Sequence, residues 1–269
     1  MRTFLNDPSG AFKYEISYDV GLKEYLFNNF FITSKIAIPL TNNIKSINEP
    51  LMENPVRSDI DRYLGQQNIK IMNLSLNYMN SLYKNTFIGV SAGYNELMFA
   101  GIGGDILYFI GDGKHAVGIG GDFVRKRDEN VLFKIKNNKN FYDYYLSYYY
   151  YMDYPEININ IKAGRFLAGD KGVRLEVSRN VKGFEIGFWY TYTNTSNFTG
   201  DNRNYHDKGV FIAIPLRIFK FKDTPQTAYM SLAPWTRDVG QLAGRPLNLY
   251  RFIRNKSPHY IKIYADEKE

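Results

Sequence analysis

Hydrophobic and polar residues alternate along most of the chain. Within residues 12–20, every even position is apolar or aromatic and every odd position is polar. The same period of two recurs in residues 72–78, 157–163, 184–193 and 210–218. Because successive side chains of a β-strand point to opposite faces, each of these segments predicts a strand with one apolar face.

Short turn sequences separate the alternating segments, for example GDGK at 111–114 and TGDNRN at 199–204. Counting the segments predicts about a dozen strands of roughly 8–12 residues, the length that crosses a bilayer at a tilt. A single helical pattern covers residues 55–64. It lies in a long loop predicted at about 41–66. No linker divides the chain, so we predict one domain over residues 1–269.

Two architectures can use such strands. In a soluble sandwich or barrel the apolar face forms the core, whereas in a membrane barrel it contacts lipid and the polar face lines the lumen. The long strands, the aromatic residues near strand ends and the Gly, Ser, Asn and charged residues of the polar face favour the second. We therefore predict an all-β fold, a transmembrane antiparallel β-barrel of about 12 strands.

Composition excludes several kinds of site and several classes of protein. Of the 269 residues 44 % are hydrophobic and none is cysteine, so disulfides and thiolate metal sites are excluded. No run approaches the roughly 18 apolar residues of a spanning helix, and the first residues lack the apolar core of a signal peptide. The net charge of +7 permits anionic partners, but Lys and Arg are scattered, so we do not expect nucleic acid to bind.

Residues 165–179, RFLAGDKGVRLEVSR, combine dense charge with alternation. We expect Val173, Leu175 and Val177 to face lipid. Arg174 and Glu176 then point inward. They are too far apart on one strand for a tight pair, so each is expected to find its partner on a neighbouring strand.

The sequence GIGGD occurs twice, at 101–105 and 118–122. Both copies lie inside alternating strands rather than before a helix, so they are not phosphate-binding loops. We predict that the two strands pair side by side and that the glycines relieve crowding in a filled lumen. The residues concerned are Gly103, Gly104, Asp105, Gly120, Gly121 and Asp122.

No pattern predicts catalysis, a metal site or a cofactor. The three histidines, His115, His206 and His259, lie in turn or tail contexts with no nucleophile at a suitable spacing. Other charged residues either lock loops or fill the lumen, or they contact an anionic polysaccharide through the lumen or rim. These candidates are Arg125, Arg127, Asp128, Asp170, Lys171, Arg174, Glu176, Asp207, Lys208, Arg237 and Asp238. The aromatic run at 142–154 fits an interfacial girdle better than a sugar-stacking surface.

Several segments resemble the YjbH/GfcD-type outer-membrane proteins of exopolysaccharide and group 4 capsule operons. They are NPVRSDIDRYL (54–64), SAGYNELMFAGIGGDILY (91–108), FVRKRD (123–128), AGRFLAGDKGVRLEVSR (163–179), HDKGVFIAIPL (206–216) and PWTRDVGQLAGRPLNLY (234–250). Members of that family are longer and carry a signal sequence and an additional N-terminal barrel. The chain is therefore expected to resemble the C-terminal barrel.

The resemblance implies a bacterial outer-membrane location and a non-enzymatic component of exopolysaccharide or capsule secretion or surface assembly. The implied partners are outer-membrane lipid and lipopolysaccharide, the polysaccharide itself, and periplasmic and outer-membrane export proteins. Two alternatives are a structural, docking or polymer-anchoring barrel and a general diffusion porin. The sequence alone does not distinguish an open lumen from a plugged one.

Overall fold

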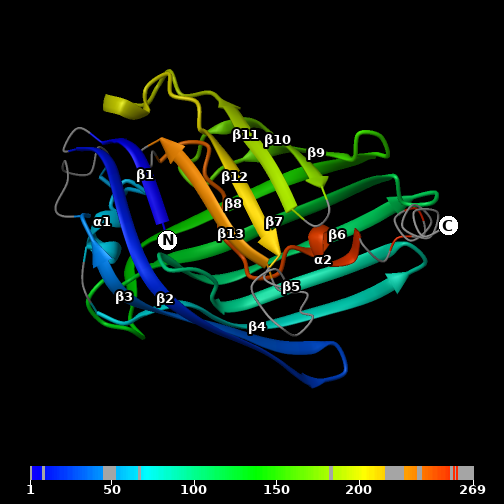
Figure 1. The fold of residues 1–269 in the computed structure, drawn as a ribbon, viewed down its shortest axis with the longest axis horizontal. Coiled ribbons are helices and arrows are strands. Elements are labelled where there is room, and N and C mark those ends of the chain that lie inside the picture. The colour runs from blue at the N-terminus through cyan, green and yellow to red at the C-terminus, as the bar shows by residue number, and fades with distance from the viewer. Residues whose placement is uncertain are drawn as a thin grey trace.

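The strands close into a single barrel (Figure 1). The structure, a computed structural model, describes residues 2–7, 10–44, 53–65, 68–181, 184–215, 227–234, 238–254, 257 and 259. Its elements are β1 (Arg2–Asp7), β2 (Gly10–Phe27), β3 (Phe30–Asn42), α1 (Ile60–Leu64), β4 (Lys70–Tyr83), β5 (Thr86–Tyr94), β6 (Phe99–Ile110), β7 (His115–Arg127), β8 (Ile135–Met152), β9 (Ile157–Arg165), β10 (Lys171–Val181), β11 (Phe184–Thr193), η1 (Gly200–Asn202), β12 (Lys208–Pro215), β13 (Thr227–Pro234) and α2 (Leu249–Ile253).

Within the described residues the barrel has 13 strands, close to the predicted dozen. Consecutive strands pair antiparallel, so an odd number leaves the first and last strands running in the same direction. Accordingly β1 pairs with β13 in parallel, through three register pairs from Thr3↔Leu232 to Leu5↔Pro234. The fold prediction is confirmed as an all-β closed barrel.

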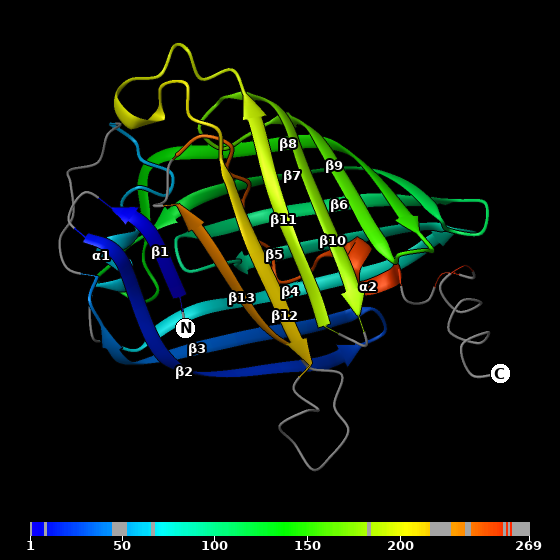
Figure 2. The ribbon, with the colours of Figure 1, turned by 45° about the horizontal axis from the view of Figure 1, so that its top comes forward.

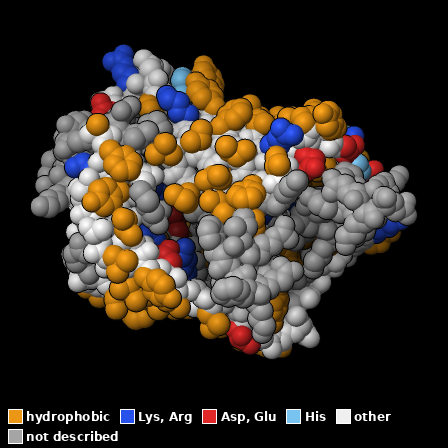
Figure 3. Space-filling view, in the orientation of Figure 1, with side chains coloured by type: hydrophobic (Ala, Val, Ile, Leu, Met, Phe, Trp, Pro, Cys, Tyr) orange, Lys and Arg blue, Asp and Glu red, His pale blue; other side chains and the backbone are white. Residues whose placement is uncertain are grey.

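Exposure along the strands follows the predicted alternation, with the apolar side chains on the outside. On β11, Ile186, Phe188 and Tyr192 are exposed, whereas Glu185 and Thr191, at alternate positions, are buried. Figure 3 shows hydrophobic side chains spread over the visible wall of strands. This sense is opposite to that of a soluble barrel, in which the exposed positions would be polar.

Two chain segments fill the interior. The first comprises residues 53–65 and carries α1 at one end of the barrel. The second comprises residues 238–254, here called the plug segment, and carries α2. Figures 1 and 2 show the plug segment running inside the ring of strands toward α2. The lumen is therefore plugged by the protein's own chain.

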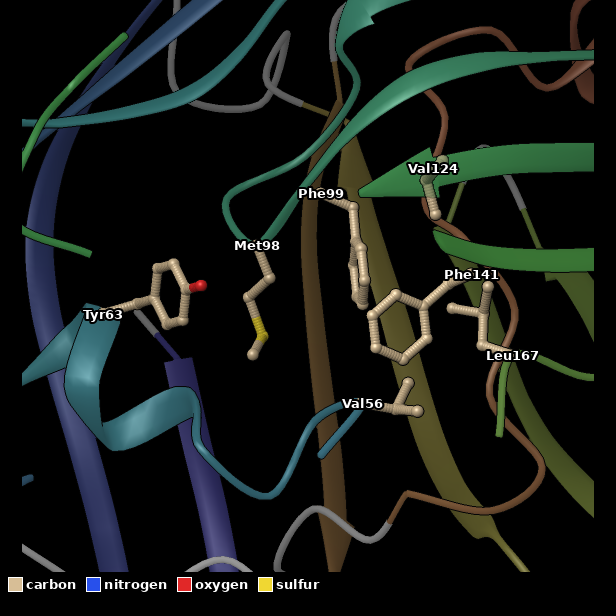
Figure 4. Packing of buried hydrophobic residues seen from close by; sticks show 7 residues of the cluster. All are labelled: Val56, Tyr63, Met98, Phe99, Val124, Phe141 and Leu167. Atoms are coloured by element: carbon tan, nitrogen blue, oxygen red, sulfur yellow. The ribbon is translucent and has the colours of Figure 1, made fainter. Parts of the chain in front are cut away.

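A buried apolar cluster seals the end at which α1 lies (Figure 4). Tyr63 of α1 and Val56 point toward Met98 and Phe99, and Phe141 packs edge-on against Phe99 at 5.3 Å between ring centroids. Burial of these rings removes a large apolar area from water, which stabilises the folded segment against the wall.

Two sequence predictions need correction. The helix predicted over 55–64 is only α1, Ile60–Leu64, because residues 56–58 are held instead by hydrogen bonds to Asp238 of the plug segment. The loop predicted at about 41–66 lies between the end of β3 at Asn42 and the start of β4 at Lys70. The aromatic run does not all face outward: Tyr145 and Tyr149 of β8 point into the lumen, and Tyr144 and Tyr148 point out.

Candidate functional site

The plug segment is anchored to the barrel wall by Arg245. Its Nη1 lies 2.9 Å from Asp105 Oδ2 on β6, and its Nε lies 3.0 Å from Asp122 Oδ1 on β7. Its Nη2 donates to Asp105 Oδ1 at 3.0 Å and to the Tyr145 hydroxyl at 2.6 Å. Because Arg245 and Asp122 are almost fully buried, removing either partner would leave an unpaired buried charge, which destabilises far more than breaking a surface ion pair.

The two GIGGD copies make room for this cluster. Gly103 pairs with Asp122 and Gly120 pairs with Asp105 across the antiparallel strands β6 and β7, so the predicted pairing is confirmed. A Cβ built on Gly103 would lie 1.8 Å from Asp122 Oδ1, and one on Gly120 would lie 2.1 Å from Asp105 Oδ1. Neither glycine has a positive φ, so the requirement is for space on the inner face.

Backbone N–H groups of the plug segment also donate to carboxylates of the wall. Gly240 donates to Asp170 at 2.7 Å, Ala243 to Asp143 at 2.8 Å and Gly244 to Glu96 at 3.1 Å. Such charge-assisted bonds satisfy an irregular backbone that has no sheet partner. Burial of Asp170, which lies in the turn before β10, raises the pKa of its carboxyl group.

Asp238 joins the two interior segments to each other. Its Oδ1 accepts from the backbone N–H groups of Val56, Arg57 and Ser58 at 2.8–2.9 Å. Its Oδ2 accepts from the Ser58 hydroxyl and from Asn202 of η1. One fully buried carboxylate therefore ties residues 56–58, η1 and the start of the plug segment together.

At the other end of the plug segment, α2 packs on the inner wall. The ring of Tyr250 stacks on Tyr149 at 3.9 Å between centroids. Arg251 lies 3.4 Å from Glu176 of β10. The plug segment is thus held by ion pairs in its middle and by aromatic stacking at its end.

A polar cavity of about 240 Å³ remains between the plug segment and the strands β6, β8, β9 and β10. From the wall, Lys162, Arg174, Glu176, Tyr145 and Ser147 line it. From the plug segment, Arg245, Asn248 and Tyr250 are among the lining residues. Rings, charges and hydrogen-bonding groups therefore surround a small, partly open space, an arrangement suited to binding a polar ligand.

Most of the charged candidates with inward side chains have partners in the structure. Arg174 Nη1 lies 3.2 Å from Asp207 Oδ2, and Trp189 Nε1 donates to the same oxygen at 2.8 Å. Asp207 precedes β12 rather than lying on a neighbouring strand, and the partner of Glu176 comes from α2. The prediction of neighbouring-strand partners was therefore wrong for both ion pairs, because the partner of Arg174 comes from the loop before β12 and the partner of Glu176 from the plug segment.

The remaining candidates lie nearer the rim. Arg127 is buried and donates to the carbonyls of Ile71 and Glu96, and with Asp128 it lines a recess of about 500 Å³. Lys171 and Lys208 are exposed, and Arg125 is half-buried. Arg237 lies outside the described residues.

Several residues of the site were not predicted from the sequence: Glu96, Asp143, Tyr145, Lys162 and Arg245. The last belongs to a stretch with no period of two, PWTRDVGQLAGRPLNLY, placed after the last strand pattern. A non-alternating charged segment at the end of a barrel sequence is a signal for an interior plug, because such a segment cannot join the wall.

The histidines are not assembled with a nucleophile in the described part of the chain. His115 Nδ1 lies 2.8 Å from the Tyr148 hydroxyl, and His206 stacks on Tyr192. His259 contacts Asp112 and Asp153 of two turns. Among the described residues there is no cluster of His, Asp and Glu suited to a metal ion, and no helix long and apolar enough to span a membrane.

Comparison with known proteins assigns the sequence to a family. The family described as "Exopolysaccharide biosynthesis protein YbjH" matches residues 1–255. The chain belongs to this family. It is 28 % identical over 265 residues to the "Uncharacterized lipoprotein YjbH" of Escherichia coli K12, covering 94 % of this chain and 37 % of that protein. The chain thus spans a little over a third of that relative's length. No solved structure matches.

Proposed function

We propose that this chain is an outer-membrane β-barrel acting without catalysis in exopolysaccharide or capsule secretion or surface assembly. Membership of an exopolysaccharide biosynthesis family supports a role in a process that involves exopolysaccharide. The outer-membrane location is supported by one observation, the apolar outer face of the strands. On β11, for example, Ile186, Phe188 and Tyr192 are exposed. Such a surface is costly in water and favourable in lipid. The E. coli relative is named a lipoprotein, which is compatible with a membrane setting.

The filled lumen bears on the kind of role. A general diffusion porin needs a water-filled channel, but here the plug segment is pinned by Arg245 and by three backbone hydrogen bonds to carboxylates. This observation favours a docking or polymer-anchoring barrel over a porin. A plugged lumen also fits an export accessory that contacts the polymer at the rim or in the interior and does not pass the polymer through the lumen.

The proposed partners follow from the surfaces. The outward face would contact lipid and lipopolysaccharide, and the rim charges would contact polysaccharide or the periplasmic and outer-membrane export proteins. Because the relative is much longer than this chain, we propose these partners for the whole protein of which such a barrel forms part.

The process is tested by deleting the gene in its own bacterium and measuring surface and total polysaccharide. We expect surface polymer to fall while total synthesis is unchanged, and the plasmid-borne gene to restore it. Unchanged surface polymer would contradict the proposed process. Separation of the membranes on a density gradient, with the protein found outside the outer-membrane fraction, would contradict the location.

The role of the plug is tested by planar-bilayer conductance of the purified protein. The wild type should show little steady conductance, and a variant lacking the Arg245 side chain should open channels. A large steady conductance of the wild type would instead favour the porin.

A further inference from the structure

Two cations face each other on the cavity wall. Lys162 of β9 and Arg174 of β10 are directly opposite in the antiparallel register, and both line the polar cavity. Like charges placed directly opposite on one sheet face destabilise it. Their juxtaposition therefore needs a compensating negative charge.

The carboxylates near the cavity are engaged with other cations. Asp207 lies beside Arg174, Asp105 holds Arg245, and Glu176 lies beside Arg251. Lys162 instead places its Nζ 4.2 Å from the centroid of the Tyr145 ring. Among the described residues, no carboxylate lies within ion-pair distance of Lys162: Asp105 and Glu176 act on its charge from farther away, and its close contact is the Tyr145 ring face.

The rest of the cavity suits a sugar ring. The aromatic side chains Tyr145, Tyr149 and Tyr250 line it, and aromatic faces pack against the apolar faces of sugar rings. Ser147 and Asn248 provide donors and acceptors for hydroxyl groups. The volume of about 240 Å³ is below the roughly 300–1,000 Å³ of sites for drug-sized ligands, which limits the occupant to one sugar unit.

We propose that this cavity binds a single anionic sugar residue, with its carboxylate between Lys162 and Arg174 and its ring against the tyrosines. The inference rests on the proposed function, because an acidic polysaccharide would supply the sugar as a terminal or side-branch unit. It narrows that function from contact with polysaccharide in general to recognition of one charged residue.

The test uses the purified full chain, folded in detergent, and isothermal titration with three probes. Glucuronate carries both ring and charge, glucose carries the ring alone, and acetate carries the charge alone. We expect glucuronate to bind at least tenfold more tightly than either of the others. Equal binding of glucose, equal binding of acetate, or no binding of glucuronate would each overturn the proposal without any variant.

Variants then locate the site. Lys162→Gln should weaken glucuronate binding at least tenfold and leave glucose binding unchanged, and Lys162→Arg should retain most of the affinity. The matched control is Lys171→Gln, which removes a lysine from an exposed residue of the neighbouring strand and should have no effect. Full affinity in a folded Lys162→Gln protein would overturn the site.

Failure of this proposal is distinguishable from failure of the proposed function. If the gene deletion lowers surface polymer but glucuronate does not bind, only the sugar site is wrong. If glucuronate binds but deletion leaves surface polymer unchanged, the cavity is a sugar site and the secretion role is wrong.

Discussion

Arg245 is the side chain whose removal should affect the protein most. Its guanidinium group pairs with Asp105 and Asp122 at 2.9 and 3.0 Å, and its side chain is 7 % exposed. At an effective dielectric constant of about 20, each pair contributes about 6 kcal/mol of attraction. Most of that attraction is offset by the desolvation of the ions, which costs several kcal/mol for each.

Replacing Arg245 by methionine keeps the bulk but leaves the buried Asp122 and the partly buried Asp105 without this cation. Losing one partner of a buried ion pair costs about 3–5 kcal/mol, so we expect the free energy of unfolding to fall by that amount. A triple variant that adds Asp105→Asn and Asp122→Asn removes all three charges. It should regain most of the loss, because an uncharged buried network carries no unpaired ion.

The assay is guanidinium unfolding of the detergent-folded protein, followed by tryptophan fluorescence and by the heat-modifiable mobility of the barrel on gels. Lys171→Gln serves as the surface control and should stay within about 0.5 kcal/mol of the wild type. The reasoning is refuted if Arg245→Met unfolds within about 1 kcal/mol of the wild type. It is also refuted if the triple variant is no more stable than the single one.

Three further predictions concern packing, pH and orientation. Gly103→Ala places a methyl group against Asp122 and should lower the free energy of unfolding by about 1–3 kcal/mol. Gly21→Ala, whose Cβ would meet no atom closer than 3.4 Å, is the control and should leave stability nearly unchanged. The midpoints of denaturant unfolding compare the two variants. Because burial raises the pKa of Asp170, its carboxyl group keeps its proton to higher pH in the folded state than in the unfolded state. The free energy of unfolding therefore falls as pH rises from about 4 through the folded-state pKa. The melting temperature of Asp170→Asn relative to the wild type should therefore increase over that range, and a constant difference would contradict the linkage. Finally, the chain has no cysteine, so Ile186→Cys and Thr191→Cys can be labelled singly; a lipid-borne quencher should reach a fluorophore at the first and not at the second. Equal quenching would refute the outward assignment.

How much was predictable differs between the wall and the interior. The alternation in residues 184–193 assigned each side chain of β11 to its face, because the period of a strand is a local property of the backbone. The repeated GIGGD correctly placed β6 beside β7. The candidate site was only partly predictable from the sequence. Asp105 and Asp122 were predicted to line the lumen, but Arg245, the cation that pairs with them, was not predicted.

The sequence by itself determined that the chain forms amphipathic strands, and it favoured a membrane β-barrel with the apolar face outward over a soluble sandwich or barrel. Turn residues and alternation carry that information within a few positions. Only the tertiary structure decided that the lumen is plugged and that Lys162 stands opposite Arg174 beside a cavity. The physical reason is the sequence separation of the contacts. The plug segment is held by ion pairs between residues that are far apart in sequence, such as Arg245 and Asp105, and no local pattern marks such pairs. Which inward charges meet depends on strand register and on the path of an irregular segment, and both are fixed only when the barrel closes.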